Sequence, residues 1–452
     1  MEQQHEPPTT RLDAVGAKPV VLVVGCGFGG LATLKDLSSD FDVIILDRNI
    51  YTTFQPLLYQ VATAGLAPSD VAYSVRAIAS KHGARFRRGE LSTISPAART
   101  VTLADGSQIG YDYLILAAGV TAAFYGVAGA AEHSRGLYTR SDAIALRDEL
   151  MGGLEQLATA GHRARLEITI VGGNATGVEM AGSLAELRNT ALRSAYPDID
   201  RDQVEIRLVE QQDDLLGPYQ PRLRRYAADQ LRRRGVDVRL GAAIKEVTAD
   251  AILLDTGERL RSDLTVWAAG VQAPETVRSW GLEQGKAGRL LVEPDLRVKG
   301  QDRIFAVGDL AADEQQPLPQ LAQPALQMGR HAARQVCRLA AGQPTEKFSY
   351  HDKGIMATIG RRSAVVELAW GPKFRGTLAW LAWLGLHLVT LLGNRNRISA
   401  LINLSWRYIA WNHGGGLIVG DEQPLLDGRD GQDDQGRGPG DPATAPDAAG
   451  IF

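Results

Sequence analysis

A glycine-rich loop between an apolar run and a helical stretch occurs twice in this chain, and its first copy lies near the N-terminus. Residues 19–24 (PVVLVV) are typical of a buried strand. The glycines of a GxGxxG pattern follow at once, at Gly25, Gly27 and Gly30, and a second apolar run later ends at Asp47. This order predicts a dinucleotide-binding βαβ unit, in which the glycines allow a tight turn, the approach of a pyrophosphate and close helix packing, while the acid binds a ribose.

The second copy begins near residue 166. Residues 166–171 (LEITIV) predict a strand, the loop runs from 172 to 177, and the next apolar run ends at Glu210. Asn174 replaces the middle glycine, so its side chain is expected to crowd the approach of a phosphate. A carboxylate at Glu210 can bind a free ribose 2′-hydroxyl and would repel a 2′-phosphate, so we expect NADH rather than NADPH.

Three further segments tie the two loops together. Residues 113–119 (YLILAAG) and 264–270 (LTVWAAG) are apolar runs that end in Ala-Ala-Gly, and residues 303–310 end in a Gly-Asp-Leu that contains Asp309. This combination resembles the two-dinucleotide-domain flavoprotein reductases. The resemblance implies an α/β fold with two Rossmann-like domains, the first for FAD and the second for NAD(P)H. An aspartate matching Asp309 holds the ribityl or pyrophosphate region of FAD in that family.

The cysteine content narrows the choice of reductase. Cys26 and Cys337 are the only cysteines, so the CxxxxC pair of the disulfide reductases is absent. Sulfide:quinone reductases need cysteines that face the flavin, whereas Cys26 lies in the phosphate loop and Cys337 on a late helical stretch. Neither cysteine pairs with other ligands in a pattern that predicts a metal site.

More specific motifs favour one branch. They are FQPLLYQVAT (54–63), AQPALQ (322–327), KGIMATIGR (353–361), AWLAWL (379–384) and NRNR (394–397). Together they resemble type II NADH dehydrogenase, the single-subunit NADH:quinone oxidoreductase of respiratory chains, over residues 20–418. The chain departs from the family at Asn174 and at Met328, where the family often has another glutamine.

The resemblance assigns residues to both cofactors. Non-covalent FAD would be bound by Gly25, Gly27, Phe28, Gly29, Gly30, Asp47, Leu91, Ala118, Gly119, Asp309, Ala322 and Gln323. NADH would be bound by Gly172, Gly173, Asn174, Thr176, Gly177, Glu179, Glu210 and Gly270.

Four side chains are the catalytic candidates. The family's glutamate at Glu179 sits beside flavin and nicotinamide, although a helix N-terminus favours an acid for its dipole alone. Gln323 and Gln327 are four apart and share a helix face, so their amides could bind the two carbonyls of a quinone. Lys353 could stabilise negative charge on reduced flavin or quinone. The alternative without a catalytic role is that the two glutamines form a polar stripe on the surface and that Lys353 is an ordinary solvent-exposed lysine.

The C-terminal region is basic and rich in tryptophan. Residues 353–420 carry eight Lys/Arg against one acid and hold five of the seven tryptophans. In an apolar stretch at 378–392, Trp380, Trp383 and His387 fall on one arc, and a helix from about 398 to 412 has a polar stripe of Ser399, Asn403 and Arg407. We expect an amphipathic helical segment lying in the headgroup boundary of a bilayer. A single span and a soluble dimer interface are the alternatives.

Six regions follow from these patterns. They are an N-terminal disordered segment (1–17), the first stretch of the FAD domain (18–130), the NADH domain (131–284), the second stretch of the FAD domain (285–350), a quinone and membrane region (351–420) and a disordered acidic tail (421–452). The tail has eight acids and two arginines, so its own net charge is −6, whereas the net charge of the whole chain is −3. That balance gives no reason to expect nucleic acid.

The sequence therefore predicts an FAD enzyme that passes a hydride from NADH to flavin and two electrons to a membrane quinone, without proton pumping. We expect it on the cytoplasmic face of the cell membrane. The alternatives are another NAD(P)H- or sulfide:quinone reductase, or a flavin redox sensor that does not turn over. Ubiquinone and menaquinone stay equal candidates, and a homodimer stays open.

Overall fold

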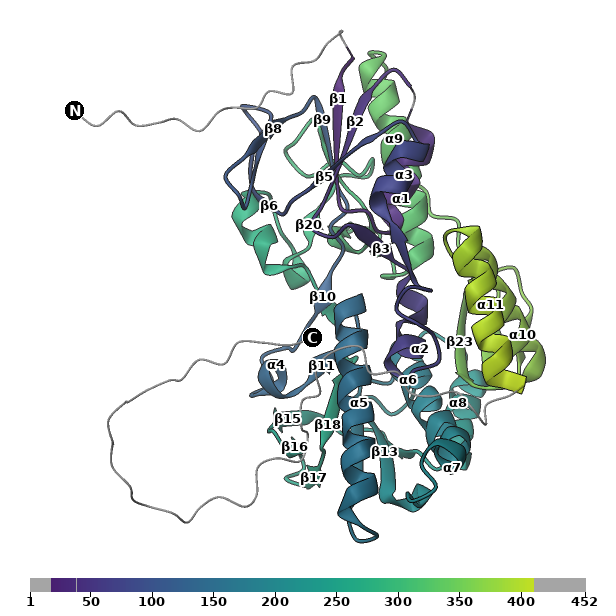
Figure 1. Ribbon diagram of the computed structural model, residues 1–452. Helices are drawn as coiled ribbons and strands as arrows, with labels where there is room; N and C mark the ends of the chain where they lie inside the picture. The colour runs from purple at the N-terminus through teal and green to yellow at the C-terminus, as the bar shows by residue number, and fades with distance from the viewer. Residues whose placement is uncertain (1–17, 38, 410–452) are drawn as a thin grey trace, which may run out of the picture.

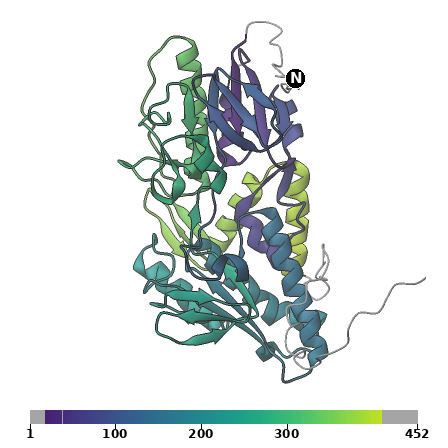
Figure 2. The same ribbon diagram turned by 90° about the vertical axis from the view of Figure 1, so that its left-hand side faces the viewer.

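The computed structural model describes residues 18–37 and 39–409, so the predicted segment 1–17, the tail at 421–452 and Trp411 lie outside the described residues. Two α/β units lie one above the other, and a pair of C-terminal helices runs along one side (Figures 1 and 2). Both units contain a parallel sheet flanked by helices, which confirms the predicted fold class.

The first unit is built on a parallel sheet with the strand order β21-β9-β1-β2-β5. Its strands are β1 (Val20–Val24), β2 (Asp42–Asp47), β5 (Arg85–Arg88), β9 (Tyr113–Leu116) and β21 (Ile304–Ala306), and its helices are α1 (Phe28–Asp36), α3 (Val75–Lys81) and α9 (Ala322–Ala340). The central strands are continuous runs of buried Val, Ile and Leu, as a sheet covered on both faces requires. Since β21 comes from beyond the second unit, two separate stretches of chain form this sheet, while the predicted domain boundaries stay predictions.

Smaller elements complete the first unit. They are β3 (Tyr51–Thr53), η1 (Gln55–Leu57), β4 (Ala72–Ser74), the antiparallel sheet β6 (Leu91–Ser95), β7 (Thr100–Leu103) and β8 (Gln108–Gly110), and then η4 (Glu275–Trp280), η5 (Lys286–Gly288), β20 (Leu290–Leu291), η6 (Gly308–Leu310) and β22 (Ala311–Ala312). The short helix α2 (Leu58–Ala62) packs instead against helices of the second unit and shares its core.

The second unit repeats the parallel architecture with the order β11-β18-β12-β13-β14. Its strands are β11 (Arg135–Gly136), β12 (Leu166–Val171), β13 (Val204–Val209), β14 (Asp237–Arg239) and β18 (Leu264–Trp267). Its helices are α4 (Ala130–His133), α5 (Arg140–Ala160), α6 (Ala175–Glu186), the π-helix η2 (Leu187–Ala191), α7 (Leu192–Ala195), η3 (Arg201–Gln203) and α8 (Pro221–Arg233), and a small sheet contains β15 (Ile244–Val247), β16 (Ala251–Leu254) and β17 (Arg259–Arg261).

A two-stranded ribbon forms the connection between the units. β10 (Thr121–Ala122) leads into the second unit, and β19 (Val271–Gln272) leads out of it. The two strands pair antiparallel, Thr121 with Gln272 and Ala122 with Val271. Both crossings of the chain are therefore hydrogen-bonded to each other.

The C-terminal region contains a sheet that the sequence analysis missed. β23 (Ile355–Gly360), β24 (Ser363–Glu367) and β25 (Lys373–Arg375) pair antiparallel, and α10 (Thr377–Thr390) packs on them. This sheet lies against α6 of the second unit, where a Cβ on Gly182 would come within 2.4 Å of the Ile359 carbonyl oxygen. The C-terminal region thus shares one hydrophobic core with the second unit.

The predicted arc of tryptophans on α10 is not at the surface, which corrects that prediction. Trp380 and Trp383 are buried, Trp383 with only 1 % of its surface exposed. The helix instead exposes aliphatic side chains, with Leu378 at 71 %. The physical reason is the newly found sheet, because large aromatic rings fill the gap between α10 and the core beneath it.

The polar stripe of α11 (Asn394–Ile409) also faces the protein. The Ser399 hydroxyl and the Asn403 amide each donate to one carboxylate oxygen of buried Asp70, both at 2.7 Å. Apolar side chains such as Ile398 and Ile402 are left exposed. The side chain of Arg407 lies outside the described residues.

Over the stretch that the structure describes, none of the helices combines the length and apolar character that a membrane span requires.

Candidate functional site

The first glycine loop has the geometry of a phosphate-binding turn. Gly25 has a φ of +95°, and a Cβ on Gly30 would lie 1.9 Å from the Gly25 carbonyl oxygen, so α1 can pack this close only with glycine there. Gly27 caps the N-terminus of α1 and faces open space, with no atom within 4 Å of the position of a Cβ. A phosphate can therefore approach the first N–H groups of the helix.

Asp47 supports this loop from the end of β2. Its carboxylate accepts hydrogen bonds from the backbone N–H groups of Cys26 (2.7 Å) and Asn49 (2.8 Å). Burial raises the pKa of Asp47 and the pKa of the neighbouring Cys26 thiol, so Cys26 is a thiol and not a reactive thiolate. Each carboxylate oxygen keeps a lone pair for a ribose hydroxyl.

The second loop repeats these relationships. Gly172 has a φ of +109°, and a Cβ on Gly177 would again lie 1.9 Å from the carbonyl oxygen of Gly172. The Glu210 carboxylate accepts from the N–H groups of Gly173 (2.5 Å) and Gln212 (2.9 Å), as Asp47 does in the first unit. The two loops therefore have the same backbone geometry and the same supporting carboxylate.

Asn174 is the N-cap residue of α6. Its side-chain oxygen accepts from the N–H of Gly177 (3.2 Å), and its amide nitrogen donates to the carbonyl of Ala268 (2.6 Å). These two bonds fix the orientation of the amide and tie the loop to the turn after β18. The departure from glycine thus supplies a helix cap, which is a common role of Asn.

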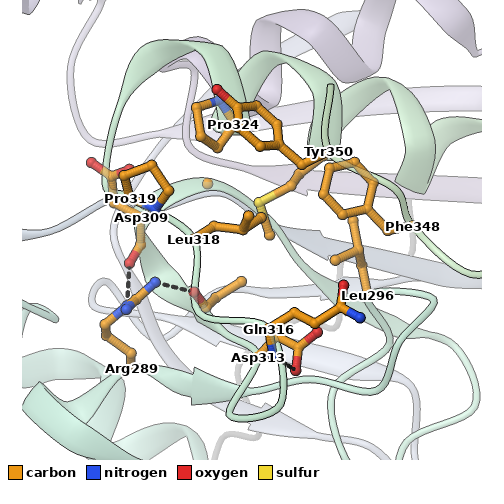
Figure 3. A pocket seen from close by; sticks show the side chains of 13 residues that line it. Arg289, Leu296, Asp309, Asp313, Gln316, Leu318, Pro319, Pro324, Phe348 and Tyr350 are labelled. Carbon is orange, nitrogen blue, oxygen red and sulfur yellow. Dashed lines mark hydrogen bonds between the residues drawn. The ribbon is translucent and has the colours of Figure 1, made fainter. Parts of the chain in front are cut away.

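Asp309 lies in η6, beside the first turn of α9. The Tyr138 hydroxyl donates to its carboxylate at 3.0 Å, and the Arg289 guanidinium donates to its backbone carbonyl at 2.7 Å. Burial raises the pKa of Asp309 to about 6, although the bond from Tyr138 lowers it. Figure 3 shows Arg289 reaching the main chain here, at one side of a pocket that Pro324 and Tyr350 also line.

The other predicted FAD residues come from several elements of the first unit. Ala118 and Gly119 follow β9, and Ala322 begins α9. Phe28 packs edge-on against Phe54, with ring centroids 5.8 Å apart. Leu91 is buried in β6, and its carbonyl accepts a bond from the Trp280 indole at 3.4 Å. Of the NADH residues, Thr176 lies in the first turn of α6 and Gly270 follows β18.

Glu179 lies in the second turn of α6, so it is beyond the first turn, where the helix dipole alone would favour an acid. Its carboxylate accepts a bond from the N–H of Thr358 in β23 at 3.2 Å. Protein surrounds the group closely, and this desolvation raises its pKa to about 8, although the Thr358 bond and the Trp383 indole lower it. The side chain keeps some accessible surface. It is therefore a carboxyl group that holds a proton near neutral pH and can exchange it with a neighbour.

Aromatic side chains pack near Glu179, among them Trp383 and His387, which the sequence analysis placed at a membrane interface. The ring of Trp383 stacks on His387 with centroids 4.1 Å apart, and Tyr59 lies 6.3 Å from Trp383. His387 Nδ1 is 2.7 Å from the Trp383 carbonyl, and because a carbonyl only accepts, Nδ1 carries the proton. Burial lowers the pKa of His387 to about 4, so the ring is neutral at pH 7.

The two glutamines of α9 differ in their surroundings. Gln327 is bonded twice to the main chain of His351, donating to its carbonyl (2.9 Å) and accepting from its N–H (3.0 Å). Gln323, one turn earlier, has no hydrogen-bond partner among the residues that the structure describes. Lys353 is exposed, two residues beyond His351. The structure thus joins Gln327 to the segment that carries Lys353, one turn of α9 beyond Gln323.

Comparisons with known proteins agree with this geometry. Residues 19–329 match the family described as pyridine nucleotide-disulphide oxidoreductase. Two curated relatives from Mycobacterium tuberculosis are the type II NADH:quinone oxidoreductases Ndh, 35 % identical over 89 % of this chain and 90 % of its own, and NdhA, 38 % identical over 86 % and 87 %. The solved structure of NDH2 from Plasmodium falciparum with NADH superposes with a TM-score of 0.81 at 18 % identity, covering 88 % of this chain and all of that one.

Proposed function

Because the chain belongs to the pyridine nucleotide-disulphide oxidoreductase family, and within it to the type II NADH:quinone oxidoreductases, we propose which of its residues serve each step of the reaction. The protein is an FAD-dependent oxidoreductase that oxidises NADH and reduces a quinone. When bound, the flavin accepts a hydride from NADH and passes two electrons on to the quinone. The assignment of residues rests on the repeated loop, with a ribose-binding acid at each copy.

The first unit would hold FAD and the second NADH. The N–H groups at the start of α1 and α6 face the positions that phosphates would take, and Asp47 and Glu210 carry free lone pairs for ribose hydroxyls. Asp309, held by Tyr138, would bind the ribityl chain. The carboxylate of Glu210 would repel a 2′-phosphate, which supports NADH as the preferred donor.

Glu179 would donate a proton during the reaction. The hydride from NADH supplies two electrons and one of the two hydrogens of the quinol, so the overall reaction takes up one further proton. A carboxyl group whose pKa is about 8 can carry a proton at neutral pH and give it up when a neighbour becomes basic. Its place on the helix that follows the second loop supports a position beside the nicotinamide.

Gln323 would bind the quinone, with Gln327 and Lys353 beside it. A free amide suits a neutral quinone because it can donate to a carbonyl without introducing charge. Gln327 has one N–H left after its two bonds to His351, so its orientation is fixed before any ligand arrives. The exposed ammonium of Lys353 would stabilise negative charge that develops on quinone during reduction.

The exposed side chains of α10 and α11 support binding to a membrane surface. Leu378, Leu381 and Val389 on α10 and Ile398 and Ile402 on α11 are all more than half exposed. His387, Ser399 and Asn403 on the same helices are instead bonded to the protein. This arrangement inverts that of a water-exposed helix pair and suits helices lying in the headgroup boundary. NADH is a charged dinucleotide that does not cross a bilayer, so we place the protein on the cytoplasmic face, where quinone dissolved in the membrane can reach it.

An anaerobic titration tests this function. The protein is purified with FAD, its visible flavin absorbance is followed as NADH is added, and a short-chain ubiquinone or menaquinone analogue is then introduced. We expect NADH to bleach the flavin, quinone to restore it, and excess NADH to be consumed for many turnovers. A single reduction with no turnover would identify a sensor, and a flavin that NADH does not bleach would contradict the assignment.

A further inference from the structure

The chain that enters the second unit is fastened to the turn that follows β18. The Trp267 indole donates to the carbonyl of Ala123 at 2.7 Å, and the N–H of Ala123 donates to the carbonyl of Gly270 at 2.9 Å. The rings of Trp267 and Phe124 also pack together, with centroids 5.6 Å apart. The residues just after β10 are thus held in a fixed position over Gly270.

This segment ends in a strained turn with an exposed aromatic ring. The N–H of Val127 donates to the carbonyl of Phe124 at 3.0 Å, and the two residues between them, Tyr125 and Gly126, have φ of +52° and +72°. Two positive φ angles define a type I′ turn, whose first central position favours Gly, Asn or Asp rather than an aromatic residue. The Tyr125 side chain is nevertheless 67 % exposed, so packing does not explain its presence.

The Tyr125 hydroxyl lies directly against Gly270. A Cβ on Gly270 would be 1.8 Å from the hydroxyl oxygen, so glycine at 270 is what leaves room for the ring. Among the residues that the structure describes, this hydroxyl has no hydrogen-bond partner. The chain therefore accepts an unfavourable backbone conformation and an exposed ring, and it places a free donor and acceptor over the end of β18.

The sheet order indicates which half of NADH would pass this point. β13, with Glu210, lies on one side of β12, and β18, with Gly270, lies on the other. A dinucleotide spans the carboxyl ends of such strands, with its pyrophosphate at the loop after the central one. If the adenosine ribose meets Glu210, the nicotinamide half must run over the end of β18. The side chain of Asn174, bonded to Ala268, marks the near edge of that path.

We propose that Tyr125 contacts the nicotinamide-ribose half of NADH, with its hydroxyl bonding a polar group of that half and its ring covering it from water. This rests on the proposed function, namely that the second unit binds NADH. The ring offers an apolar face beside the site of hydride transfer, and the phenol can both donate and accept. Tyr125 is then a residue that distinguishes a complete dinucleotide from its adenosine half.

Two ligands and two variants test this. Binding of NAD⁺ and of ADP, which lacks both the nicotinamide and its ribose, is measured by titration calorimetry on the oxidised holoenzyme, where no turnover occurs. Tyr125→Asn removes the ring but places a favoured residue in the type I′ turn, so it separates loss of the ring from damage to the turn. Tyr125→Phe keeps the ring and removes only the hydroxyl.

We expect Tyr125→Asn to weaken NAD⁺ binding by about tenfold and Tyr125→Phe by roughly threefold to fivefold, since a single hydrogen bond contributes modestly. ADP should bind all three proteins alike. Equal weakening of both ligands, or no weakening of NAD⁺, would overturn the role of Tyr125. If the unmodified holoenzyme binds neither ligand, the assignment of the second unit to NADH fails instead.

Discussion

Tyr138, in the segment that leads into α5 of the second unit, donates a hydrogen bond to the carboxylate of Asp309 in the first unit at 3.0 Å. Both groups are largely buried, and the bond crosses between the two units. Asp309 would bind the ribityl chain of FAD, and Tyr138 belongs to the unit that would bind NADH. A residue of the second unit therefore fixes the position of an FAD-binding acid in the first.

Removing this hydroxyl should weaken FAD binding. In Tyr138→Phe the buried carboxylate of Asp309 loses one partner, and a lost bond to a charged group weakens binding by about 1–3 kcal/mol, or roughly fivefold to a hundredfold. The dissociation constant of FAD, measured by fluorescence at pH 7, should rise by that amount. Tyr111→Phe serves as the control, because the buried Tyr111 hydroxyl has no hydrogen-bond partner within residues 18–37 and 39–409. FAD affinity unchanged in Tyr138→Phe would contradict the role of the pair.

Glu179 should make stability depend on pH. Its folded-state pKa of about 8 lies above the ordinary value of 4.5, so the folded protein binds this proton more tightly than the unfolded chain. The stability that this proton provides is complete below about pH 4.5 and is lost as the pH rises through about 8. In urea unfolding, the unmodified protein should lose a few kcal/mol relative to Glu179→Gln between about pH 5 and pH 8. Parallel profiles of the two proteins would refute this.

Glu210 should set the choice between NADH and NADPH. Glu210→Arg replaces a group that repels a 2′-phosphate with one that binds it, so kcat/KM for NADPH should rise and that for NADH should fall. Glu210→Ala should narrow the preference without reversing it. Steady-state rates with both donors measure this. Equal efficiency of the two donors in the unmodified protein would show that Glu210 does not discriminate.

The sequence was sufficient to predict those parts of the fold in which the backbone conformation requires a particular residue type. The glycines at 25, 30, 172 and 177 predict both loops, because no other residue type allows the helices to approach so closely. Apolar runs predict the buried parallel strands, since such strands have no polar face. The comparisons confirm the family and the reaction class that these motifs indicated.

The sequence analysis predicted the wrong face of α10 as exposed, because it missed the sheet on which this helix packs. Trp383 looks like a membrane-interface residue by composition, and only the sheet formed by β23, β24 and β25 turns it inward. Tyr138 and Tyr125 carry no motif, because their positions depend on contacts with residues more than 140 apart in the chain. The bond between Gln327 and His351 is likewise a tertiary contact that the four-residue spacing cannot predict.

Substitutions of the two glutamines should both slow the quinone half-reaction, but only one of them should lower the stability of the fold. Gln323→Leu should slow reoxidation of reduced flavin by quinone in stopped-flow traces, while reduction by NADH stays nearly unchanged. Gln327→Leu should slow the same step, but it should also lower the unfolding temperature, because it leaves the polar main chain of His351 without its two bonds. Loss of the NADH half-reaction alone would place both glutamines on the wrong side of the flavin.

Membrane binding should depend on the exposed aliphatic side chains of α10 and α11. Leu381 and Ile402 are 51 % and 59 % exposed, and burying such area in a bilayer stabilises by about 25 cal/mol per Å². Leu381→Gln with Ile402→Gln should therefore weaken binding to vesicles that contain anionic lipid by roughly tenfold or more in a flotation assay. Deleting α10 would be a poorer test, because it removes buried Trp383 from the core.

Salt and a matched exposed residue complete that test. Arginines at 395 and 397 should each add about 1 kcal/mol near an anionic surface, so high salt should weaken binding of the unmodified protein without abolishing it. Tyr125→Asn removes an equally exposed ring at the ribbon between the units and should leave vesicle binding unchanged. If salt alone strips the unmodified protein from vesicles, attachment is electrostatic and the aliphatic surface does not enter the bilayer. If the double variant binds as well as the unmodified protein, α10 and α11 are not the side that faces the membrane.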